Sequence, residues 1–242
     1  MNVTGLMVVR GQPDALELSL RSFKKHMRPG WKVLVWINHD DTGPSDVDRR
    51  CLDLAKSFDF VRVYGYQRNC VHGHGGALDA MVAVSSMEEG LLVTMDSDIV
   101  FHRDPWPEVT RLAHAGYTCV GASLYPGSVD PVPDAGMFSG FIFQPRIDPC
   151  FAAFRNQELQ RLRIHGGGSF QCLADICTRK FWDVGAKVYE SMRMAGMPVV
   201  APDAVAKAVG HWGGTSWMPD DQKRERLAAI QESLEMLRRE QG

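Results

Sequence analysis

Short apolar runs alternate with longer amphipathic segments over the first hundred residues of the chain. The runs are rich in β-branched residues and predict buried strands at TGLMVV (4–9), KVLVWI (32–37), FVRVYGY (60–66) and LLVTM (91–95). The segments between them carry apolar residues at helical spacing and predict helices over 13–27, 44–58 and 76–90. Strand–helix alternation with short connections predicts an α/β fold, in which helices cover both faces of a mainly parallel sheet.

The pattern loosens after residue 100. YTCVGASLY (117–125), FSGFIFQP (138–145) and MPVVAP (197–202) predict further strands, and the segment 123–137 is rich in Pro, Gly and Asp, which favours a loop. FQCLADICTRKFWDVG (170–185) is predicted to form a helix capped by Ser169.

The C-terminal segment 219–241 predicts an amphipathic helix. Its leucine and isoleucine residues follow one another in helical step: Leu227, Ile230, Leu234 and Leu237. No repeat or low-complexity linker interrupts the chain, so we expect a single domain over residues 1–242. Within it we distinguish a first half (1–105), a second half (106–218) and the C-terminal helix (219–242).

Composition says little about the fold, but it argues against several classes of function. Hydrophobic residues make up 45% and charged residues 23% of the chain, as in ordinary globular proteins. A net charge of −2 gives no general attraction to nucleic acid or to an anionic membrane. The six cysteines include no C-x-x-C pair, which argues against a zinc ribbon. We find no signal-peptide pattern and no apolar run long enough to span a bilayer, and we expect a cytoplasmic protein with reduced thiols.

Two carboxylates interrupt the apolar run VTMDSDIVF (93–101). Asp96 and Asp98 follow the fourth predicted strand, and charges beside a buried strand are costly unless they are paired or bind a metal. In open parallel sheets, ligands bind beyond the carboxyl ends of the strands, and alternate residues of an extended segment point the same way. Two oxygen donors there suit Mg²⁺ or Mn²⁺, which in turn binds a diphosphate. The alternative is that they cap a loop or pair with Arg103.

LLVTMDSDIVFHRDPW (91–106) resembles the D-x-D segment of GT-A-fold glycosyltransferases of the family 2 type, which use nucleotide-diphospho-sugars. VVRGQPDALELSLRSF (8–23) resembles their first nucleotide-binding strand and helix, and VLVWINHDD (33–41) their second strand with its acidic end. The segment that begins GHGGALDA (73–80) looks like the helix leading to the metal site. The resemblance implies a GT-A-like fold, with the nucleotide sugar bound by residues 1–105 and the acceptor by residues 106–218.

The resemblance also implies roles for individual residues. The nucleotide would meet two strand ends, formed by Val9, Arg10 and Gly11 and by Asn38 with Asp40 or Asp41. Asp96 would face the ribose or bind the metal through water, with Ser97 beside it, and Asp98 would ligate the metal directly. His211 in VGHWGGTSW would be a late metal ligand, or alternatively a histidine bonded to a backbone carbonyl.

RNCVHGHGGALD (68–79) departs from the family, which commonly carries an Arg-Asn pair where this chain has Leu78-Asp79. Glycines such as Gly75 at a helix start would present backbone N–H groups to a phosphate. Asp79 would contact sugar hydroxyls, or only stabilise the helix N-terminus. His72 and His74 lack a third ligand in this segment and are weak candidates for a metal pair.

Asp175 is the candidate general base, because the resemblance implies an Asp near the start of a helix after the acceptor loop. The family often has a Glu-Asp pair there, whereas this chain has Ala174-Asp175. If Asp175 is not the base, the enzyme retains configuration, and the stereochemistry stays open. DAGMFSGFIF (134–143) corresponds to the floor of the sugar pocket, where Gly140 would allow close approach of a ligand.

The function expected is therefore a metal-dependent transfer of sugar from a nucleotide-diphospho-sugar, a UDP- or GDP-sugar for preference, to an acceptor hydroxyl. The acceptor (a glycan, a small molecule, a lipid-linked molecule or a nucleic acid) and a homodimeric state stay open. MDSDIV (95–100) also resembles the nucleophile motif of haloacid-dehalogenase-type phosphatases, and a non-catalytic nucleotide-sugar-binding scaffold is a further alternative. A sugar-phosphate nucleotidyltransferase shares the fold, but VVRGQPDAL (8–16) is a poor match to its Gly- and Arg-rich loop.

Overall fold

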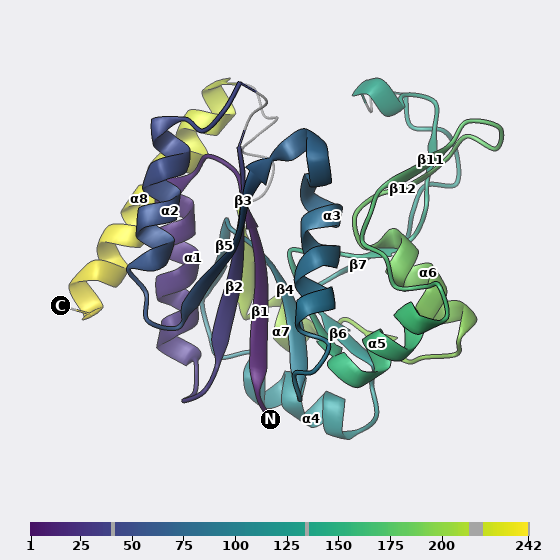
Figure 1. The fold of residues 1–242 in the computed structure, drawn as a ribbon, viewed down its shortest axis with the longest axis horizontal. Helices are drawn as coiled ribbons and strands as arrows, with labels where there is room; N and C mark the ends of the chain where they lie inside the picture. The colour runs from purple at the N-terminus through teal and green to yellow at the C-terminus, as the bar shows by residue number, and fades with distance from the viewer. Residues whose placement is uncertain (40–41, 134–135, 213–219, 242) are drawn as a thin grey trace.

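A seven-stranded sheet forms the centre of the molecule (Figure 1) in the order β13-β6-β10-β4-β1-β2-β3. The computed structural model describes residues 1–39, 42–133, 136–212 and 220–241. The strands are β1 (Val3–Val9), β2 (Lys32–His39), β3 (Val61–Arg68), β4 (Leu91–Asp96), β6 (Cys119–Gly121), β10 (Phe151–Arg155) and β13 (Val199–Val200). β10 runs antiparallel to β4 and β6, and the other pairs of this sheet are parallel. The predicted mainly parallel sheet is confirmed.

Helices cover both faces of this sheet, as the sequence predicts. Met7 and Val9 of β1 point to the face covered by α1 (Pro13–His26), α2 (Asp46–Lys56) and α4 (Trp106–His114). Leu6 and Val8 point to the face covered by α3 (Asn69–Val84), α5 (Asn156–Ile164) and α6 (Ala186–Met194). Every residue of β1 is buried, which agrees with its largely apolar sequence.

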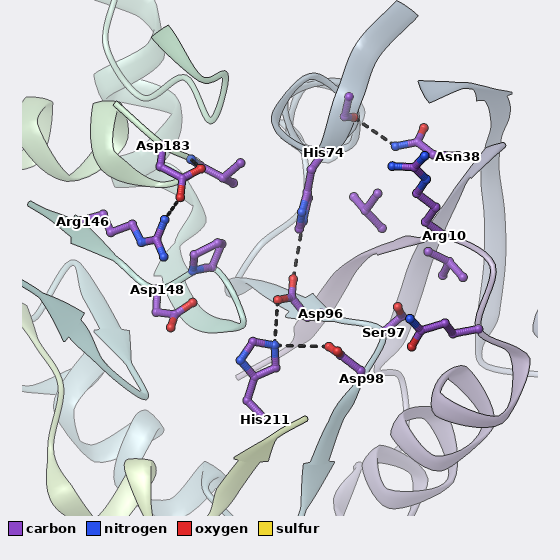
Figure 2. A pocket seen from close by; sticks show the side chains of 16 residues that line it. Arg10, Asn38, His74, Asp96, Ser97, Asp98, Arg146, Asp148, Asp183 and His211 are labelled. Atoms are coloured by element: carbon purple, nitrogen blue, oxygen red, sulfur yellow. Dashed lines mark hydrogen bonds and ion pairs between the residues drawn. The ribbon is translucent and has the colours of Figure 1, made fainter. Parts of the chain in front are cut away.

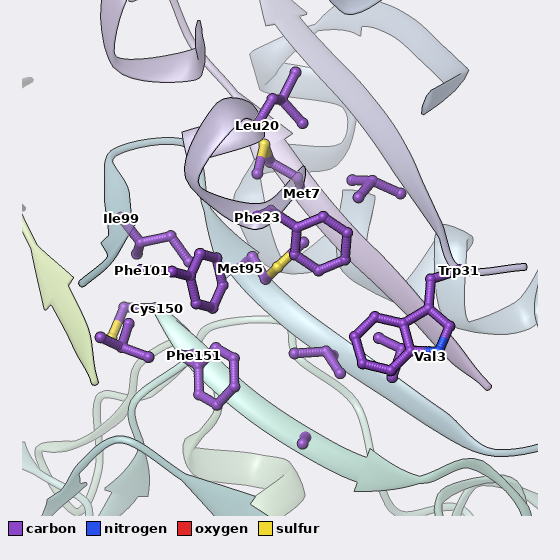
Figure 3. Packing of buried hydrophobic residues seen from close by; sticks show 14 of the residues in the cluster. Val3, Met7, Leu20, Phe23, Trp31, Met95, Ile99, Phe101, Cys150 and Phe151 are labelled. Atoms are coloured by element: carbon purple, nitrogen blue, oxygen red, sulfur yellow. The ribbon is translucent and has the colours of Figure 1, made fainter. Parts of the chain in front are cut away.

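Aromatic side chains fill the first of these two cores (Figure 3). The ring of Phe23 on α1 lies 5.8 Å from that of Phe101 and 5.9 Å from that of Trp106, between ring centroids. Phe101 belongs to β5 (Ile99–Phe101), the short strand that follows the two acidic residues. The packing therefore fixes the chain directly after Asp98 in the core.

α8 (Asp220–Gln241) packs on the outer side of α1 and confirms the predicted C-terminal amphipathic helix. Ile230 and Leu234 are buried against Ala15 and Leu18 of α1. Within the described part of the chain, no helix is both long enough and apolar enough to cross a membrane.

The predicted helix over 170–185 is wrong. The segment forms an antiparallel pair, β11 (Leu173–Asp175) and β12 (Lys180–Trp182), and β12 also pairs with β8 (Ile142–Phe143). The aromatic ring of Phe181 lies 4.0 Å from that of Phe138 and 5.0 Å from that of Phe143, between centroids. This packing, supplied by a segment distant in sequence, outweighs the helical spacing of the apolar residues.

Other elements of the second half are shorter than predicted or were not predicted. The expected strands 117–125 and 138–145 are reduced to β6, β7 (Leu124–Tyr125) and β8, with a 3₁₀ turn, η1 (Gly136–Phe138). The sequence reasoning also missed β5, α4, β9 (Arg146–Ile147), β10, α5, α6, α7 (Asp203–Ala206) and β14 (Val209–His211).

Candidate active site

The carboxyl ends of β1, β2 and β4 meet at a cavity of about 520 Å³ (Figure 2). Val9 and Arg10 lie at the end of β1, Asn38 at the end of β2, and Asp96 at the end of β4. The cavity is completed by Val8, Gln12, Gly73, His74, Ser97, Asp98, Arg146, Asp148, Pro149, Asp183, Val184 and His211. Strands that run in the same direction end at the same edge, which is why these distant segments converge.

Asp96, Asp98 and His211 come together on the floor of this cavity. His211 Nε2 lies 3.2 Å from Asp96 Oδ2 and 3.2 Å from Asp98 Oδ1. One ligand atom of each side chain lies within 4.8 Å of the other two. The structure thus unites the three residues that the sequence nominated as metal ligands.

A short strand pair delivers the late histidine to this cluster. β14 pairs antiparallel with β5, and the register places His211 opposite Ile99. The backbone N–H of Trp212 donates to the carbonyl of Asp98 at 3.0 Å, which extends the pairing. Gly210 allows β14 to lie close to the end of β5, because a Cβ at that position would lie 2.4 Å from Nε2 of His102.

The side chains of Asp96 and His211 shift each other's pKa. Burial alone would raise the pKa of Asp96, but a hydrogen bond from His211 and the positive charges of His74 and Arg146 bring it below its ordinary value. Burial disfavours a charged His211, yet Asp96, Asp98 and Cys150 raise its pKa to about 12. A divalent ion bound by Asp96, Asp98 and His211 would have to displace the proton that these carboxylates favour on the imidazole.

The donor set fits a divalent ion. Asp96 Oδ1 is buried and has no hydrogen-bond partner among the described residues, although His74 Nε2 lies 3.5 Å away. A buried carboxylate oxygen without a partner is costly, and a metal would complete its coordination. Two carboxylates and an imidazole are ligands that Mn²⁺ and Mg²⁺ accept.

Asn38 organises the opposite wall. Its Oδ1 accepts from the indole N–H of Trp36 at 3.0 Å, and its Nδ2 donates to the carbonyl of Gly73 at 3.2 Å. Gly73 has φ 57°, a left-handed conformation that glycine adopts without strain. This link holds the kink at Gly73 inside α3 so that His74 faces Asp96 (Figure 2).

Sequence reasoning missed the residues on the far side of the cavity. Arg146 on β9 forms an ion pair with Asp183, and its guanidinium carbon lies 5.5 Å from the ring centroid of Tyr125. Asp148 Oδ2 accepts from the hydroxyl of Ser123 at 3.2 Å. These residues sit on short strands and turns without a motif, so only their three-dimensional convergence reveals them.

Asp79 and Gly75 lie outside the cavity lining and serve packing. The Asp79 carboxylate accepts from Arg163 at 2.7 Å, from the Ser169 hydroxyl at 2.8 Å and from the backbone N–H of Phe170 at 3.1 Å. A Cβ at Gly75 would lie 2.1 Å from the Phe170 carbonyl oxygen. Both residues therefore fasten α3 to the segment 168–170.

Asp175, Gly140 and Gly11 also lie away from the lining of the main cavity. Asp175 ends β11, and its carboxylate accepts from the Thr178 hydroxyl and from the backbone N–H groups of Thr178 and Cys177. These bonds lower its pKa, which weakens it as a base. Gly11 lines an adjacent hollow with Arg10 and Gln12. Asp40 lies outside the described residues.

No family model matches this sequence, and no curated protein matches it. Solved structures do match the fold. The mannosyltransferase PcManGT from Pyrobaculum calidifontis, in complex with GDP-Man and Mn²⁺, is 16% identical, with a TM-score of 0.56 over 97% of this chain and 73% of that one. The 4-diphosphocytidyl-2C-methyl-D-erythritol synthase from Anaerococcus prevotii is 12% identical, with a TM-score of 0.54 over 95% and 98%.

A third match is the galactosyltransferase LgtC in complex with donor and acceptor sugar analogs, 11% identical with a TM-score of 0.52 over 96% of each chain. The chain has the GT-A fold. Identities this low establish a shared architecture, and the reaction has to be argued from the site. In this GT-A fold, Asp96 and Asp98 follow β4 at the centre of the sheet, with Arg10 and Arg146 on opposite sides of them (Figure 2).

Proposed function

We propose that this chain is a metal-dependent glycosyltransferase that moves a sugar from a nucleotide-diphospho-sugar to an acceptor hydroxyl. The observation that carries the proposal is the convergence of Asp96, Asp98 and His211 at the end of β4 in a cavity of about 520 Å³. The same fold in PcManGT accompanies GDP-Man and Mn²⁺, which makes a GDP-sugar the first donor to test.

Asp98 and His211 would hold Mn²⁺ or Mg²⁺ directly, and Asp96 would bind the ion through water or face the ribose. When bound, the ion would neutralise the charge that develops on the diphosphate leaving group. Arg146 adds a fixed positive charge on the cavity wall, oriented by its ion pair with Asp183. Together, the ion and Arg146 would stabilise the diphosphate as its bond to the sugar breaks.

The two sides of the cavity suggest how the donor lies. Val9, Arg10 and Asn38 form the side at the ends of β1 and β2, which we assign to the nucleoside. Asp148 and Asp183 lie on the opposite side (Figure 2), where carboxylates would accept hydrogen bonds from sugar hydroxyls. The carboxylate of Asp175 is occupied by its own turn, so we do not assign it as the base, and inversion and retention both stay open.

Other reactions find less support in the site. Among the described residues that line the cavity there is no lysine, which a haloacid-dehalogenase-type phosphatase would need beside its nucleophile. A nucleotidyltransferase shares the GT-A architecture, but the chain after β1 lacks its Gly- and Arg-rich loop. A non-catalytic scaffold would bind the nucleotide sugar without turnover.

The test is a thermal-shift panel of UDP-, GDP-, CDP- and dTDP-sugars, each with and without Mn²⁺. A ligand that binds only the native state raises the apparent stability by mass action, by about 2.7 kcal/mol at a concentration of 100 times its dissociation constant. We expect one nucleotide to shift the wild-type melting temperature only when metal is present. Asp98→Ala should lose this shift, whereas the exposed control Asp59→Ala should keep it.

Absence of a metal-dependent shift with every donor would contradict the proposal. A melting-temperature shift would favour the scaffold over the transferase if no nucleotide is released when simple sugars or water are offered as acceptors.

A further inference from the structure

His211 belongs to a second group of potential metal ligands besides the one formed with Asp96 and Asp98. Asp148 and Cys150 each place a ligand atom within 4.8 Å of one another and of the imidazole. Nε2 of His211 faces Asp96 and Asp98, and Figure 2 shows the other ring nitrogen turned toward the side on which Asp148 lies. The imidazole of His211 is thus shared by two sets of potential metal ligands, one with Asp96 and Asp98 and one with Asp148 and Cys150.

The second set is held in place by its own hydrogen bonds. Asp148 Oδ1 accepts from the backbone N–H of Cys150 at 3.1 Å, and its Oδ2 accepts from Ser123 at 3.2 Å. Cys150 is only 4% exposed, and its carbonyl accepts from the backbone N–H of Asp96 at 3.1 Å. The carboxylate and the thiol are therefore oriented before any ion arrives, and they are tied to the end of β4.

We propose that Asp148, Cys150 and His211 form a second, inhibitory metal site that takes Zn²⁺ or Co²⁺. A thiolate, an imidazole nitrogen and a carboxylate oxygen are each ligands of Zn²⁺, and three protein ligands leave a fourth position for water. The first set lacks sulfur and suits Mn²⁺ or Mg²⁺. When the ion binds, a metal–sulfur bond forms and the Cys150 thiol loses its proton to solvent.

The two sites exclude each other through the imidazole. A neutral histidine has one nitrogen with a free electron pair and one that carries a proton, so His211 serves one ion at a time. An ion at Asp148 and Cys150 therefore withdraws a ligand from the ion at Asp96 and Asp98. This inhibitory part rests on the proposed function, whereas the existence of the thiolate site does not.

Cobalt tests the thiolate site without donor or manganese. We expect Co²⁺ added to the wild-type chain to produce thiolate-to-cobalt charge-transfer absorption in the near ultraviolet. Cys150→Ala should abolish the band, and Asp148→Asn should weaken cobalt binding, whereas the control Cys172→Ala, at an exposed cysteine, should leave both unchanged. A band that persists in Cys150→Ala, or no band in the wild type, would overturn the proposal.

Competition is measured separately by the sharp paramagnetic resonance signal of free Mn²⁺. Zn²⁺ should release bound Mn²⁺ from the wild type. For the same release from Cys150→Ala, the Zn²⁺ concentration should have to be at least about tenfold higher. Asp98→Ala should lose Mn²⁺ binding but keep the cobalt band. A wild type that gives no cobalt band but binds Mn²⁺ normally refutes only the second site, and normal Mn²⁺ binding by Asp98→Ala refutes the first.

Discussion

At the scale of single residues, Arg146 is the strongest functional candidate that the sequence did not reveal. Its guanidinium is held by Asp183 and lies against the ring of Tyr125, so it is oriented before a ligand binds. Arg146→Gln should weaken binding of a nucleoside diphosphate about tenfold or more, because a charged hydrogen bond contributes about 1.5–3 kcal/mol. Calorimetric titration of the diphosphate and of the nucleoside measures this.

The nucleoside without phosphates should bind Arg146→Gln as well as it binds the wild type. Arg193→Gln, at an exposed position on α6, is the matched control and should bind both ligands normally. Equal losses for diphosphate and nucleoside would show that Arg146 supports the cavity wall and not the phosphates.

Asp79, nominated for ligand binding, differs from Arg146 in lying outside the cavity lining, where it makes packing contacts. Its carboxylate accepts from Arg163, Ser169 and Phe170. Asp79→Ala should lower the free energy of unfolding by about 1–3 kcal/mol, because these partly buried donors lose their acceptor. Donor affinity of the folded variant, measured below its melting temperature, should stay unchanged. A weaker donor affinity with wild-type stability would restore its predicted role at the sugar.

Asp96 and Asp98 could be found from the sequence because their pattern is local. Asp96 and Asp98 stand two positions apart after an apolar run, and that spacing alone predicts two carboxylates at a strand end. Arg146 and Asp148 have no such context, because their place at the cavity depends on the β7–β9 pair. His211 was placed by resemblance, and the β5–β14 register supplies its physical reason.

At the scale of elements, the α1–α8 contact depends on a buried acid. Glu17 is 8% exposed and accepts hydrogen bonds from Arg21 at 2.7 Å and from Arg238 Nε at 3.0 Å. Burial alone would raise the pKa of Glu17, but Arg238 and Arg21 bring it below the ordinary value of 4.5. The ion pairs of Glu17 with Arg238 and Arg21 therefore contribute fully to stability above pH 4.5. This contribution is lost as the pH falls through the lower pKa of Glu17 in the folded state.

Glu17→Gln should accordingly be less stable than the wild type at neutral pH, and the difference should shrink in acid below pH 4.5. Denaturant unfolding at several pH values measures it. Glu240→Gln is the control, because the Glu240 carboxylate pairs with Lys25 at 53% exposure and exposed pairs contribute little. A difference between Glu17→Gln and the wild type that does not vary with pH would contradict this account.

The β11–β12 pair shows why local periodicity fails in the second half. Leu173, Cys177 and Phe181 recur at helical spacing, yet Leu173 is 48% exposed and Phe181 is buried. The partners of Phe181 are Phe138 and Phe143, which lie about forty residues earlier in the chain. A window of neighbouring residues contains no information about such partners.

At the scale of the whole molecule, the elements that could be predicted from sequence are those that pack against their neighbours along the chain. β1 to β4 alternate with helices. β1, β2 and β4 are buried almost throughout and read as largely apolar runs, whereas the edge strand β3 mixes buried and exposed residues. β10 enters the sheet antiparallel between β4 and β6, and its insertion depends on contacts far apart in the chain. The cavity is lined by residues of β1, β2 and β4 and by residues of the later segments. The sequence therefore predicts the wall formed by the ends of these three strands but not the wall that carries Arg146 and Asp148.

The candidate metal site is connected to α8 through the backbone. Arg226 of α8 donates to the carbonyl of Trp212, the residue after His211, and β14 pairs with β5. The backbone N–H of Phe101 on β5 donates to the Ser22 hydroxyl of α1 at 3.1 Å, and α1 is the helix on which α8 packs. An ion that fixes His211 therefore stabilises the same contacts that hold α8.

We expect Mn²⁺ to slow amide hydrogen exchange in β14 and α8, and to leave α6, on the other face of the sheet, unchanged. Asp98→Ala should remove this protection. Because coupling between two equilibria is reciprocal, Leu234→Ala, which removes a buried contact of α8, should also weaken Mn²⁺ binding. If Mn²⁺ binds with normal affinity while α8 exchanges at the same rate with and without it, the metal site and the C-terminal helix are independent.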